Sequence, residues 1–327
     1  MKKKSQIRTI ETVIRFPKRL VGSIDLCAQE FKIEIVGYKG VMVMPRPEQG
    51  LLKDTKGITK VSSIGTNLIQ PPSKILKGLT SVEWGKMLSS KGVSSFQSCI
   101  IYFQFNKNQH YKVAAQKISG EVYNYFTKLE LFLEIISGMN FENEFAEKIN
   151  ESEPSFHTTN DSKISNVNSG VFSFKAILYG TGDGIQVSEI AQAINYSNRA
   201  LEPNIAHKYI RDAKYSLKND DYRKSIIDAG TAVEIALTRI CESHLSKNNH
   251  GKFVKEVLKK YKTLGGRLTL ADILNFDLTE KREIIDNKLV TLRNEAVHKG
   301  TVHNRTQIAE AVEIASAIVK KYCDYYE

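Results

Sequence analysis

The sequence has 327 residues, of which 41% are hydrophobic and 25% charged, and its formal net charge is +11. No stretch approaches the ~20 apolar residues that a transmembrane helix needs, and no apolar run follows the basic start MKKKSQIRTIE as it would in a signal peptide. The composition therefore indicates a globular protein, long enough for two domains, that we expect in the cytoplasm and not in a membrane.

The cysteines and histidines give no sign of a metal site or a disulfide framework. The four cysteines are Cys27, Cys99, Cys241 and Cys323, and no two of them form a CxxC pair. The seven histidines show no HExxH or other close ligand spacing. We therefore expect reduced thiols, no bound metal and no cofactor.

The positive charge is spread over both halves of the chain. Residues 201–327 hold 22 Lys/Arg and 18 Asp/Glu, a net charge of +4, and the remaining residues carry +7. A net positive charge favours acidic partners, nucleic acid first. Because many basic proteins bind no nucleic acid, the charge permits an RNA partner without requiring one.

The first half of the sequence is patterned as strands. Residues 9–16 and 31–35 alternate apolar and polar side chains, as half-buried strands do. Residues 41–44 and 99–105 are continuous apolar runs, which favour more deeply buried strands. Residues 171–178 again place alternate apolar side chains on one face. These patterns predict a sheet.

One long helix is predicted between these strands, because apolar residues recur every three or four positions. Its stripe consists of Tyr111, Ala114, Ile118, Val122, Tyr125, Leu129, Phe132 and Ile136. We expect the stripe to pack on the sheet and complete an α+β domain over residues 1–203. Residues 151–170 are polar and predict a loop.

A glycine-rich stretch, residues 179–190, lies between a predicted strand and a predicted helix, where phosphate-binding loops also occur. It reads GxGxG instead of GxGxxG and lacks the Lys-Ser/Thr of a P-loop. We interpret it as a flexible turn.

The period becomes helical from about Ala206, and four principal helices with short ones between the second and third predict an all-α bundle over residues 204–327. The third helix should begin near Thr279, as its N-cap, and end at Gly300, because a glycine is favoured just past a helix C-terminus. The other predicted segments include residues 221–245, 252–262 and 305–323. A tetratricopeptide pair is the rival interpretation, but only one copy is present and such repeats need neighbours.

The third helix carries the most informative residues, TLRNEAVHKG, residues 291–300. RNEAVH, late in the third helix of a four-helix bundle, resembles the Arg-x(4–6)-His motif of the HEPN superfamily, in which a polar residue often follows the arginine. The resemblance covers about 120 residues, 206–327, and includes the small-residue-rich second helix DAGTAVEIALTR.

The resemblance implies a metal-independent endoribonuclease that is active as a dimer, in which the ribose 2′-hydroxyl attacks the adjacent phosphate and leaves a 2′,3′-cyclic end. Arg293 would then stabilise the charge on the phosphate. His298 would act as a general acid or base, or orient an oxygen. Asn294 would position a phosphate oxygen or His298.

Helix geometry agrees with a dimer. Arg293 and His298 lie about 140° apart on a regular helix, whereas Asn294 and His298 share a face. A two-fold axis beside this helix would bring two copies of the motif into one cleft.

Each candidate also has a purely structural interpretation. Arg293 can pair with Glu295, Glu234 or Asp286, and His298 can be a helix-end residue that the macrodipole favours. Three further residues could support the motif: Glu234 could orient Arg293, and Lys299 and His303 could contact RNA. We expect all three mainly as solvent-exposed side chains without such a role.

These observations predict an α+β N-terminal domain followed by a HEPN-like bundle that cleaves RNA as a toxin or effector of antiphage defence or stress. The N-terminal domain would sense a phage-derived or host protein trigger, regulate the nuclease or recruit RNA. The alternative is a non-catalytic HEPN-type module that binds RNA, nucleotide or a partner protein.

Overall fold

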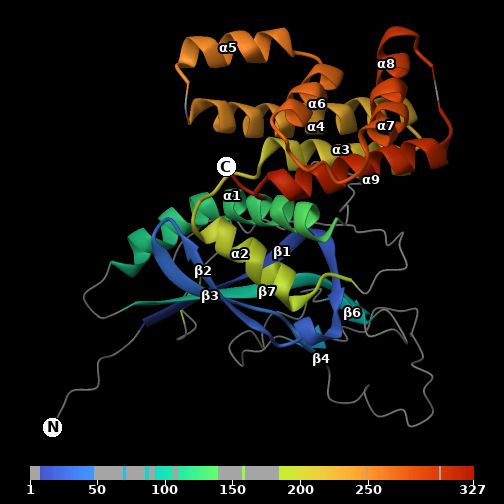
Figure 1. The fold of residues 1–327 in the computed structure, drawn as a ribbon. Coiled ribbons are helices and arrows are strands. Elements are labelled where there is room, and N and C mark those ends of the chain that lie inside the picture. Colours follow the sequence, from blue (N-terminus) through green and yellow to red (C-terminus); the bar gives the residue numbers. More distant parts are fainter. Residues whose placement is uncertain are drawn as a thin grey trace. The chain divides into compact units, whose positions relative to one another are not determined.

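The computed structural model describes residues 8–47, 69–70, 85–87, 93–105, 110–138, 157–158, 184–247, 249–301 and 303–327. The chain divides into two compact units, residues 1–200 and 201–327. Strands occur in the first unit and helices dominate the second (Figure 1). The predicted α+β class is therefore confirmed.

The first unit is built on an antiparallel sheet in the order β2-β3-β7-β1-β8, with β6 also paired to β7. A separate two-stranded sheet joins β4 and β5, and a short 3-10 helix, η1 (Ile24–Leu26), follows β1. The strands are β1 (Arg8–Ser23), β2 (Glu30–Ile35), β3 (Tyr38–Val43), β4 (Arg46–Pro47), β5 (Ile69–Gln70), β6 (Gly85–Met87), β7 (Val93–Phe105) and β8 (His157–Thr158).

The long strands β1 and β7 form the centre of this sheet. They pair with Ile10 opposite Phe103 and Ile14 opposite Cys99, and the register shifts between Arg15 and Leu20. Ile10, Ile14 and Phe103 are buried, as the alternation in β1 and the apolar run in β7 predict. The predicted strands over residues 9–16, 31–35, 41–44 and 99–105 are confirmed.

Helices α1 (Tyr111–Ser137) and α2 (Val187–Asn198) pack on each other and on the sheet. The predicted stripe of α1 is buried from Ala114 to Phe132. Asn198, the last residue of α2, accepts hydrogen bonds from the Tyr125 hydroxyl at 2.9 Å and the Glu34 amide at 2.8 Å. One amide side chain therefore ties α2 to both α1 and β2.

Two predictions in this half fall largely outside the described residues. These are the strand over residues 171–178 and the loop over residues 151–170, of which the structure describes only His157–Thr158, a strand. The glycine-rich stretch is described only from Gly184 onward: Gly184 has a φ of +73°, which glycine adopts without strain, and α2 begins three residues later.

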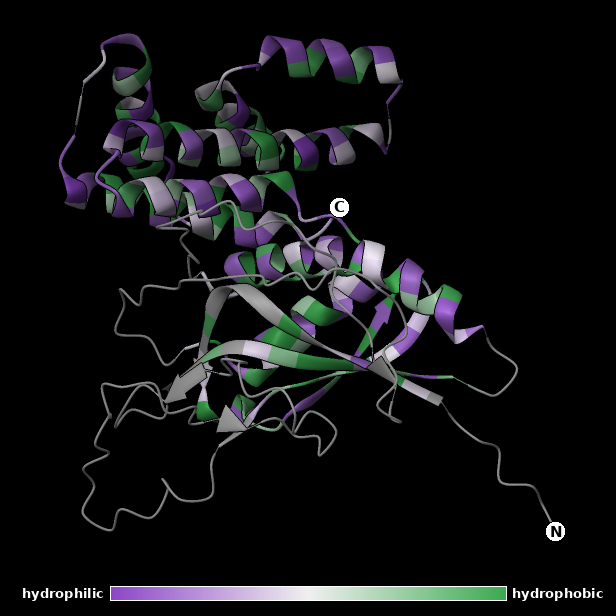
Figure 2. Ribbon diagram, turned by 180° about the vertical axis from the view of Figure 1, so that it is seen from behind, coloured by the Kyte–Doolittle hydropathy of each residue, from purple (hydrophilic) through white to green (hydrophobic). Residues whose placement is uncertain are grey.

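The second unit is a bundle whose helices show the banded hydropathy of amphipathic helices (Figure 2). In order of sequence they are α3 (Ile205–Lys218), α4 (Tyr222–Ser246), α5 (Gly251–Lys260), α6 (Leu264–Ile273), α7 (Arg282–Ile285), η4 (Asp286–Val290), α8 (Thr291–His298) and α9 (Arg305–Tyr322). Helices α3, α4 and α9 pack on one another, and α6, η4 and α8 pack on α4.

Small side chains allow these helices to approach closely. Alanines are fully buried on all three central helices, at Ala213, Ala229, Ala236 and Ala315 among others. Larger apolar residues such as Leu237 complete the core. A close-packed interior of this kind holds the helices in one arrangement.

The third helix departs from the prediction at its start and in its middle. Thr279 is not its N-cap: the helix begins at Arg282 after Lys281, which makes no side-chain cap. The preceding segment is held by α9, whose Tyr322 hydroxyl donates to the Asp277 carbonyl at 2.6 Å. The hydrogen bond holds Asp277, in the non-helical segment that leads to Arg282, against α9.

Candidate functional site

The middle of the third helix is π-helical, over Asp286–Val290. A π segment uses i→i+5 hydrogen bonds, so α8 is rotated relative to a regular continuation by up to one residue's step, about 100°. Helix α8 then buries Leu292 and Ala296 against the bundle. It ends as predicted before Gly300, whose φ is +65°.

Arg293 lies at the border between the buried and exposed faces of α8. Its aliphatic stem covers Gly230 of α4 so closely that a Cβ on Gly230 would lie 2.8 Å from the Arg293 Cγ. The guanidinium Nη2 is 3.7 Å from Oε2 of Glu234, one turn further along α4, and Nη1 donates to Asn294 Oδ1 at 3.3 Å. Of the three carboxylates that could pair with Arg293, Glu234 is its ion-pair partner.

The Nε–H group of Arg293 is buried and has no hydrogen-bond partner among the described residues. An unsatisfied buried donor costs about 1–3 kcal/mol. The Arg293 side chain is 23% exposed, so part of it still reaches solvent. The arginine is thus oriented by α4, with a buried Nε–H that no described group satisfies.

Asn294 and His298 lie together on the exposed face of α8. Thr291 and Val297 share this face, and Val297 is an exposed hydrophobic residue. The His298 imidazole has no hydrogen-bond or ion-pair partner within the described part of the chain. Since α8 is a regular helix, His298 and Arg293 point about 140° apart, and one protomer does not bring them onto one phosphate.

Glu295 lies beside the two remaining candidate residues, Lys299 and His303, at the end of α8. Its Oε1 is 3.3 Å from Lys299 Nζ and its Oε2 is 3.4 Å from His303 Nε2. Lys299 is solvated as expected, with 69% of its side chain exposed. His303 is not: only 10% of its side chain is exposed, so the expectation of a solvated loop residue is wrong.

The last carbonyls of α8 also receive donors. Arg223, near the start of α4, donates from Nε to the Ala296 carbonyl at 3.0 Å, and the Thr301 amide donates to the Glu295 carbonyl at 3.3 Å. Cationic and N–H groups at this position satisfy the free carbonyls and complement the helix dipole.

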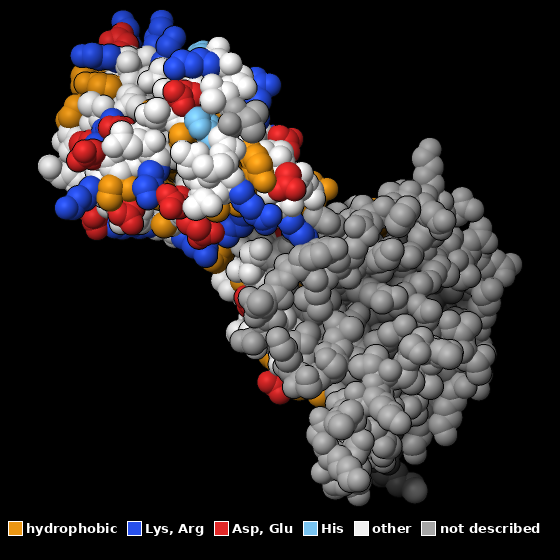
Figure 3. All heavy atoms as spheres, turned by 90° about the vertical axis from the view of Figure 1, so that its right-hand side faces the viewer, with side chains coloured by type: hydrophobic (Ala, Val, Ile, Leu, Met, Phe, Trp, Pro, Cys, Tyr) orange, Lys and Arg blue, Asp and Glu red, His pale blue; other side chains and the backbone are white. Residues whose placement is uncertain are grey.

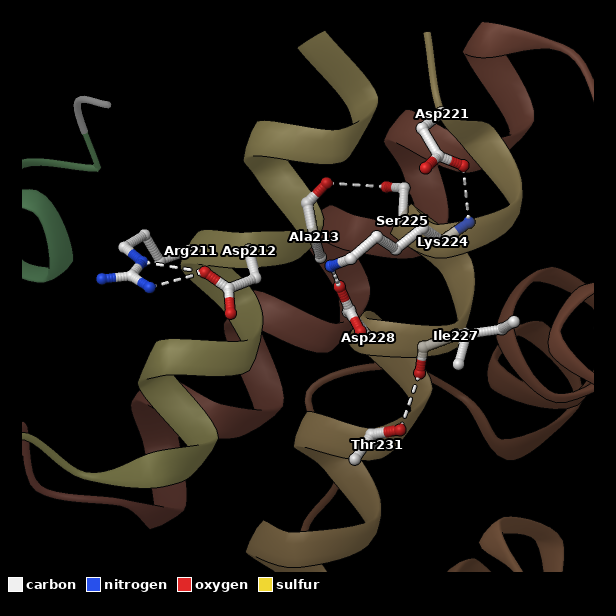
Figure 4. A network of polar contacts seen from close by, with 9 residues as sticks. All are labelled: Arg211, Asp212, Ala213, Asp221, Lys224, Ser225, Ile227, Asp228 and Thr231. Atoms are coloured by element: carbon white, nitrogen blue, oxygen red, sulfur yellow. Dashed lines mark hydrogen bonds and ion pairs between the residues drawn. The ribbon is translucent and has the colours of Figure 1, made fainter. Parts of the chain in front are cut away.

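A polar network fastens the same part of α4 to α3 (Figure 4). The Ser225 hydroxyl donates to the Ala213 carbonyl at 2.8 Å, and Lys224 forms an ion pair with Asp228. Burial raises the pKa of the Asp228 carboxyl, and the Lys224 ammonium partly offsets this rise. The hydrogen bond to Asp228 in turn raises the pKa of Lys224. The network fixes the half of α4 on which Arg293 rests.

One residue that positions the motif, Gly230, was missed by reasoning from the sequence. Gly230 supplies the space for the Arg293 stem, whereas Glu295, considered only as a partner of Arg293, lies beside Lys299 and His303. Glu295 carries a local signal, since it lies four residues before Lys299. Gly230 carries only a weak one, a glycine inside a helix that would otherwise favour alanine.

The face of the helical unit on the side where α8 lies carries interspersed acidic and basic side chains (Figure 3). No group of three or more His, Cys, Asp or Glu among the described residues is arranged to hold a metal ion. No helix in the described part of the chain combines the length and apolar character needed to cross a bilayer.

Comparison with protein-family models, with curated proteins and with solved structures finds no match to this chain.

Proposed function

We propose that the chain is a metal-independent HEPN-type endoribonuclease and acts in the cytoplasm as an effector of antiphage defence or stress. RNA is the substrate, and a homodimer through the helical unit forms the cleaving site. The observation that carries the proposal is the orientation of Arg293, held over Gly230 beside Glu234 with part of its side chain reaching solvent. A planar guanidinium with free donors is suited to bind a phosphate.

In the proposed reaction the ribose 2′-oxygen attacks phosphorus, the bond from phosphorus to the 5′-oxygen breaks, and a 2′,3′-cyclic phosphate remains. One proton leaves the 2′-hydroxyl and one reaches the departing 5′-oxygen. His298 carries one of these transfers, since imidazole exchanges protons near neutral pH. Arg293 stabilises the charge that develops on the phosphate oxygens.

The exposed face of α8 supports a composite site. Asn294, Val297 and His298 lie on this face, so a second copy that covers it adds its own motif to the same cleft. Such an arrangement overcomes the 140° separation within one chain. The first unit would then sense a trigger, restrain the site or recruit RNA.

The test is cleavage of unmodified end-labelled RNA by the full chain, with and without excess EDTA. We expect Arg293→Ala and His298→Ala each to reduce cleavage at least about 100-fold, because each removes a charge-stabilising or proton-transferring group. Arg305→Ala and His244→Ala serve as matched controls, since both residues are exposed and lie on other helices, α9 and α4. Products should carry cyclic phosphate ends, one water lighter than linear phosphates.

Mixing the two inactive variants tests the dimer. Mixed dimers retain one Arg293 and one His298, so activity should partly return if both motifs serve one cleft. A strict monomer by light scattering at micromolar concentration, with and without RNA, would exclude the composite site. Full cleavage by the Arg293→Ala/His298→Ala double variant would assign the activity elsewhere.

A second candidate function is a non-catalytic HEPN-type module that binds RNA, nucleotide or a partner protein. The ion pair of Arg293 with Glu234 and the lack of an orienting partner for His298 favour it. RNA binding that Arg293→Ala weakens, with no cleavage by the unaltered chain under any condition tested, would select this alternative.

A further inference from the structure

Helix α5 lies toward the opposite end of α4 from α8 (Figures 1 and 2). Its inward face buries Val254 and packs Val257 and Leu258 against the core of the helical unit. Arg267 of α6 fastens it, donating from Nη1 to the Leu258 carbonyl at 2.7 Å and from Nε to Thr238 Oγ1 of α4 at 2.8 Å. The helix is therefore a fixed part of the bundle.

The positive charge of the helical unit is concentrated in this helix and its flanks. Residues 247–262 hold six lysines and one acidic residue. The rest of residues 201–327 holds 16 Lys/Arg and 17 Asp/Glu, so its net charge is −1. Without residues 247–262 the unit would carry no positive excess.

The lysines of α5 have no ion-pair partners among the described residues, in contrast to several other cations of the unit. Arg239, Arg282 and Lys321 each pair with a carboxylate, at 2.6 Å in each case. Lys252, Lys255 and Lys259 have no carboxylate within ion-pair distance among the described residues. Three uncompensated charges on one short helix create a local positive potential.

These three lysines form one outward stripe, which we call the α5 lysine stripe. Positions 252, 255 and 259 fall within about 60° of one another on a regular helix and span about 10 Å along it. Phe253, which is 50% exposed, lies with Lys260 about 80–100° round the helix from Lys252, and the exposed Glu256 lies between them and the stripe. A row of ammonium groups beside an exposed ring is suited to a polyanion whose units have aromatic faces.

We propose that the α5 lysine stripe, with Phe253, is a docking surface for the backbone and bases of single-stranded RNA. The choice of RNA over DNA rests on the proposed function, but the electrostatic argument does not. An anionic membrane fits less well, because an interfacial helix must insert its apolar face and α5 buries that face in the bundle. The end of α4 that precedes α5 lies about 18 Å along the helix from Glu234, so RNA held on α5 would have to extend along the unit to reach α8.

The test is fluorescence anisotropy of the full chain with a labelled, fully 2′-O-methylated RNA of about 20 nucleotides, longer than the ~4–16 nucleotides that one binding module covers. Methylation blocks the 2′-hydroxyl as a nucleophile, so binding is measured apart from cleavage. We expect Lys252→Ala/Lys255→Ala/Lys259→Ala to raise the Kd at least about 10-fold near 0.1 M salt. The slope of log K against log salt should fall by about 2, since each single-strand phosphate contact contributes ~0.7.

The matched control is Lys208→Ala/Lys281→Ala/Lys320→Ala, which removes the same charge from other parts of the unit and should change the Kd less than about threefold. The variant with arginine at positions 252, 255 and 259 keeps the charge and should bind like the unaltered chain. Phe253→Ala should also weaken binding, because a base loses its stacking partner. Far-UV circular dichroism checks that each variant is folded.

Two outcomes would overturn the proposal. One is an equal loss of RNA binding in both lysine triples, which would reduce the effect to net charge. The other is binding to phosphatidylserine vesicles that the α5 triple abolishes while RNA binding persists. Binding without cleavage of unmodified RNA would reject the proposed nuclease and leave the docking surface intact.

Discussion

The two ends of helix α4 use charge in different ways. Near its start the charged groups are engaged: Lys224 pairs with Asp228, Arg223 caps the end of α8 and Arg293 pairs with Glu234. Beyond its last turn, α5 presents the lysine stripe without carboxylate partners among the described residues.

This difference separates two tasks. An ion pair or a buried stem limits a side chain to one geometry, which a reacting group requires. An exposed, unpaired lysine keeps its conformational freedom and an unscreened electrostatic field, which suit capture of a polyanion from solution. On the proposed function, the first end of α4 positions a reacting group and the second attracts RNA.

The largest expected effect is on the free energy of unfolding, and it compares how firmly α8 and α5 are anchored at the two ends of α4. Leu289, in η4 before α8, and Val254, in α5, are both buried. Leu289→Ala should lower the free energy of unfolding by about 2–5 kcal/mol, through lost burial and a cavity. Val254→Ala should lower it by only about 1–2 kcal/mol, because fewer atoms are removed and α5 has a smaller core contact.

Urea denaturation followed by circular dichroism at 222 nm measures both values. Hydrogen exchange should show that Val254→Ala opens α5 locally while α8 keeps its protection. An equal loss at the two positions would mean that α5 is as deeply anchored as α8.

An intermediate effect concerns the fit between Gly230 and Arg293. Gly230→Ala gains up to about 1 kcal/mol of helix propensity, but its Cβ would meet the Arg293 Cγ at 2.8 Å. We expect the clash to cancel the gain and to displace Arg293, so RNA cleavage should fall while the melting temperature changes little.

A double-mutant cycle isolates this contact. In the Arg293→Ala background Gly230→Ala should become stabilising, with a coupling free energy of about 0.5–2 kcal/mol. If the two free-energy changes simply add, the position of the Arg293 stem does not depend on having a glycine at position 230.

The smallest expected effect is a pH dependence near the far end of α4. The buried His207 ring lies 4.7 Å from Tyr325, and its Nε2 is 3.0 Å from the Cys323 carbonyl, so Nε2 carries the proton. Burial lowers the pKa of His207. The unfolded chain, with a histidine pKa near 6.5, then binds more protons than the native one. Stability should therefore fall as the pH is lowered through about 6.5 toward the native pKa.

Thermal melts at pH values from about 7.5 to 5.5 test this dependence. His207→Gln keeps an N–H donor for the carbonyl and does not titrate, so its melting temperature should vary less over this range. An identical pH profile for the two proteins would assign the dependence to other groups.

Local patterns in the sequence predicted most of the described elements. The apolar stripe of α1, the alternation in β2 and the glycine after α8 each depend on residues only a few positions apart, and the structure contains all three. Backbone geometry determines these periodicities, so they can be recognised in the sequence without knowing which elements pack together.

The candidate site was only partly predictable for the opposite reason. The sequence placed Arg293, Asn294 and His298 on one helix and left Arg293 with three candidate partners. The choice of Glu234 depends on which turn of α4 faces α8, and residues 59 positions apart in the chain meet only after the bundle packs.

By itself the sequence determined the α+β class, the run of helices and the residues of the motif, because hydrophobic periodicity and glycine conformation act over short distances. Tertiary structure decided where α7 begins, the π segment before α8, the burial of His303 and the space over Gly230 that the Arg293 stem fills. Of these, the contact between Gly230 and Arg293 joins helices distant in sequence, where packing overrides local preference.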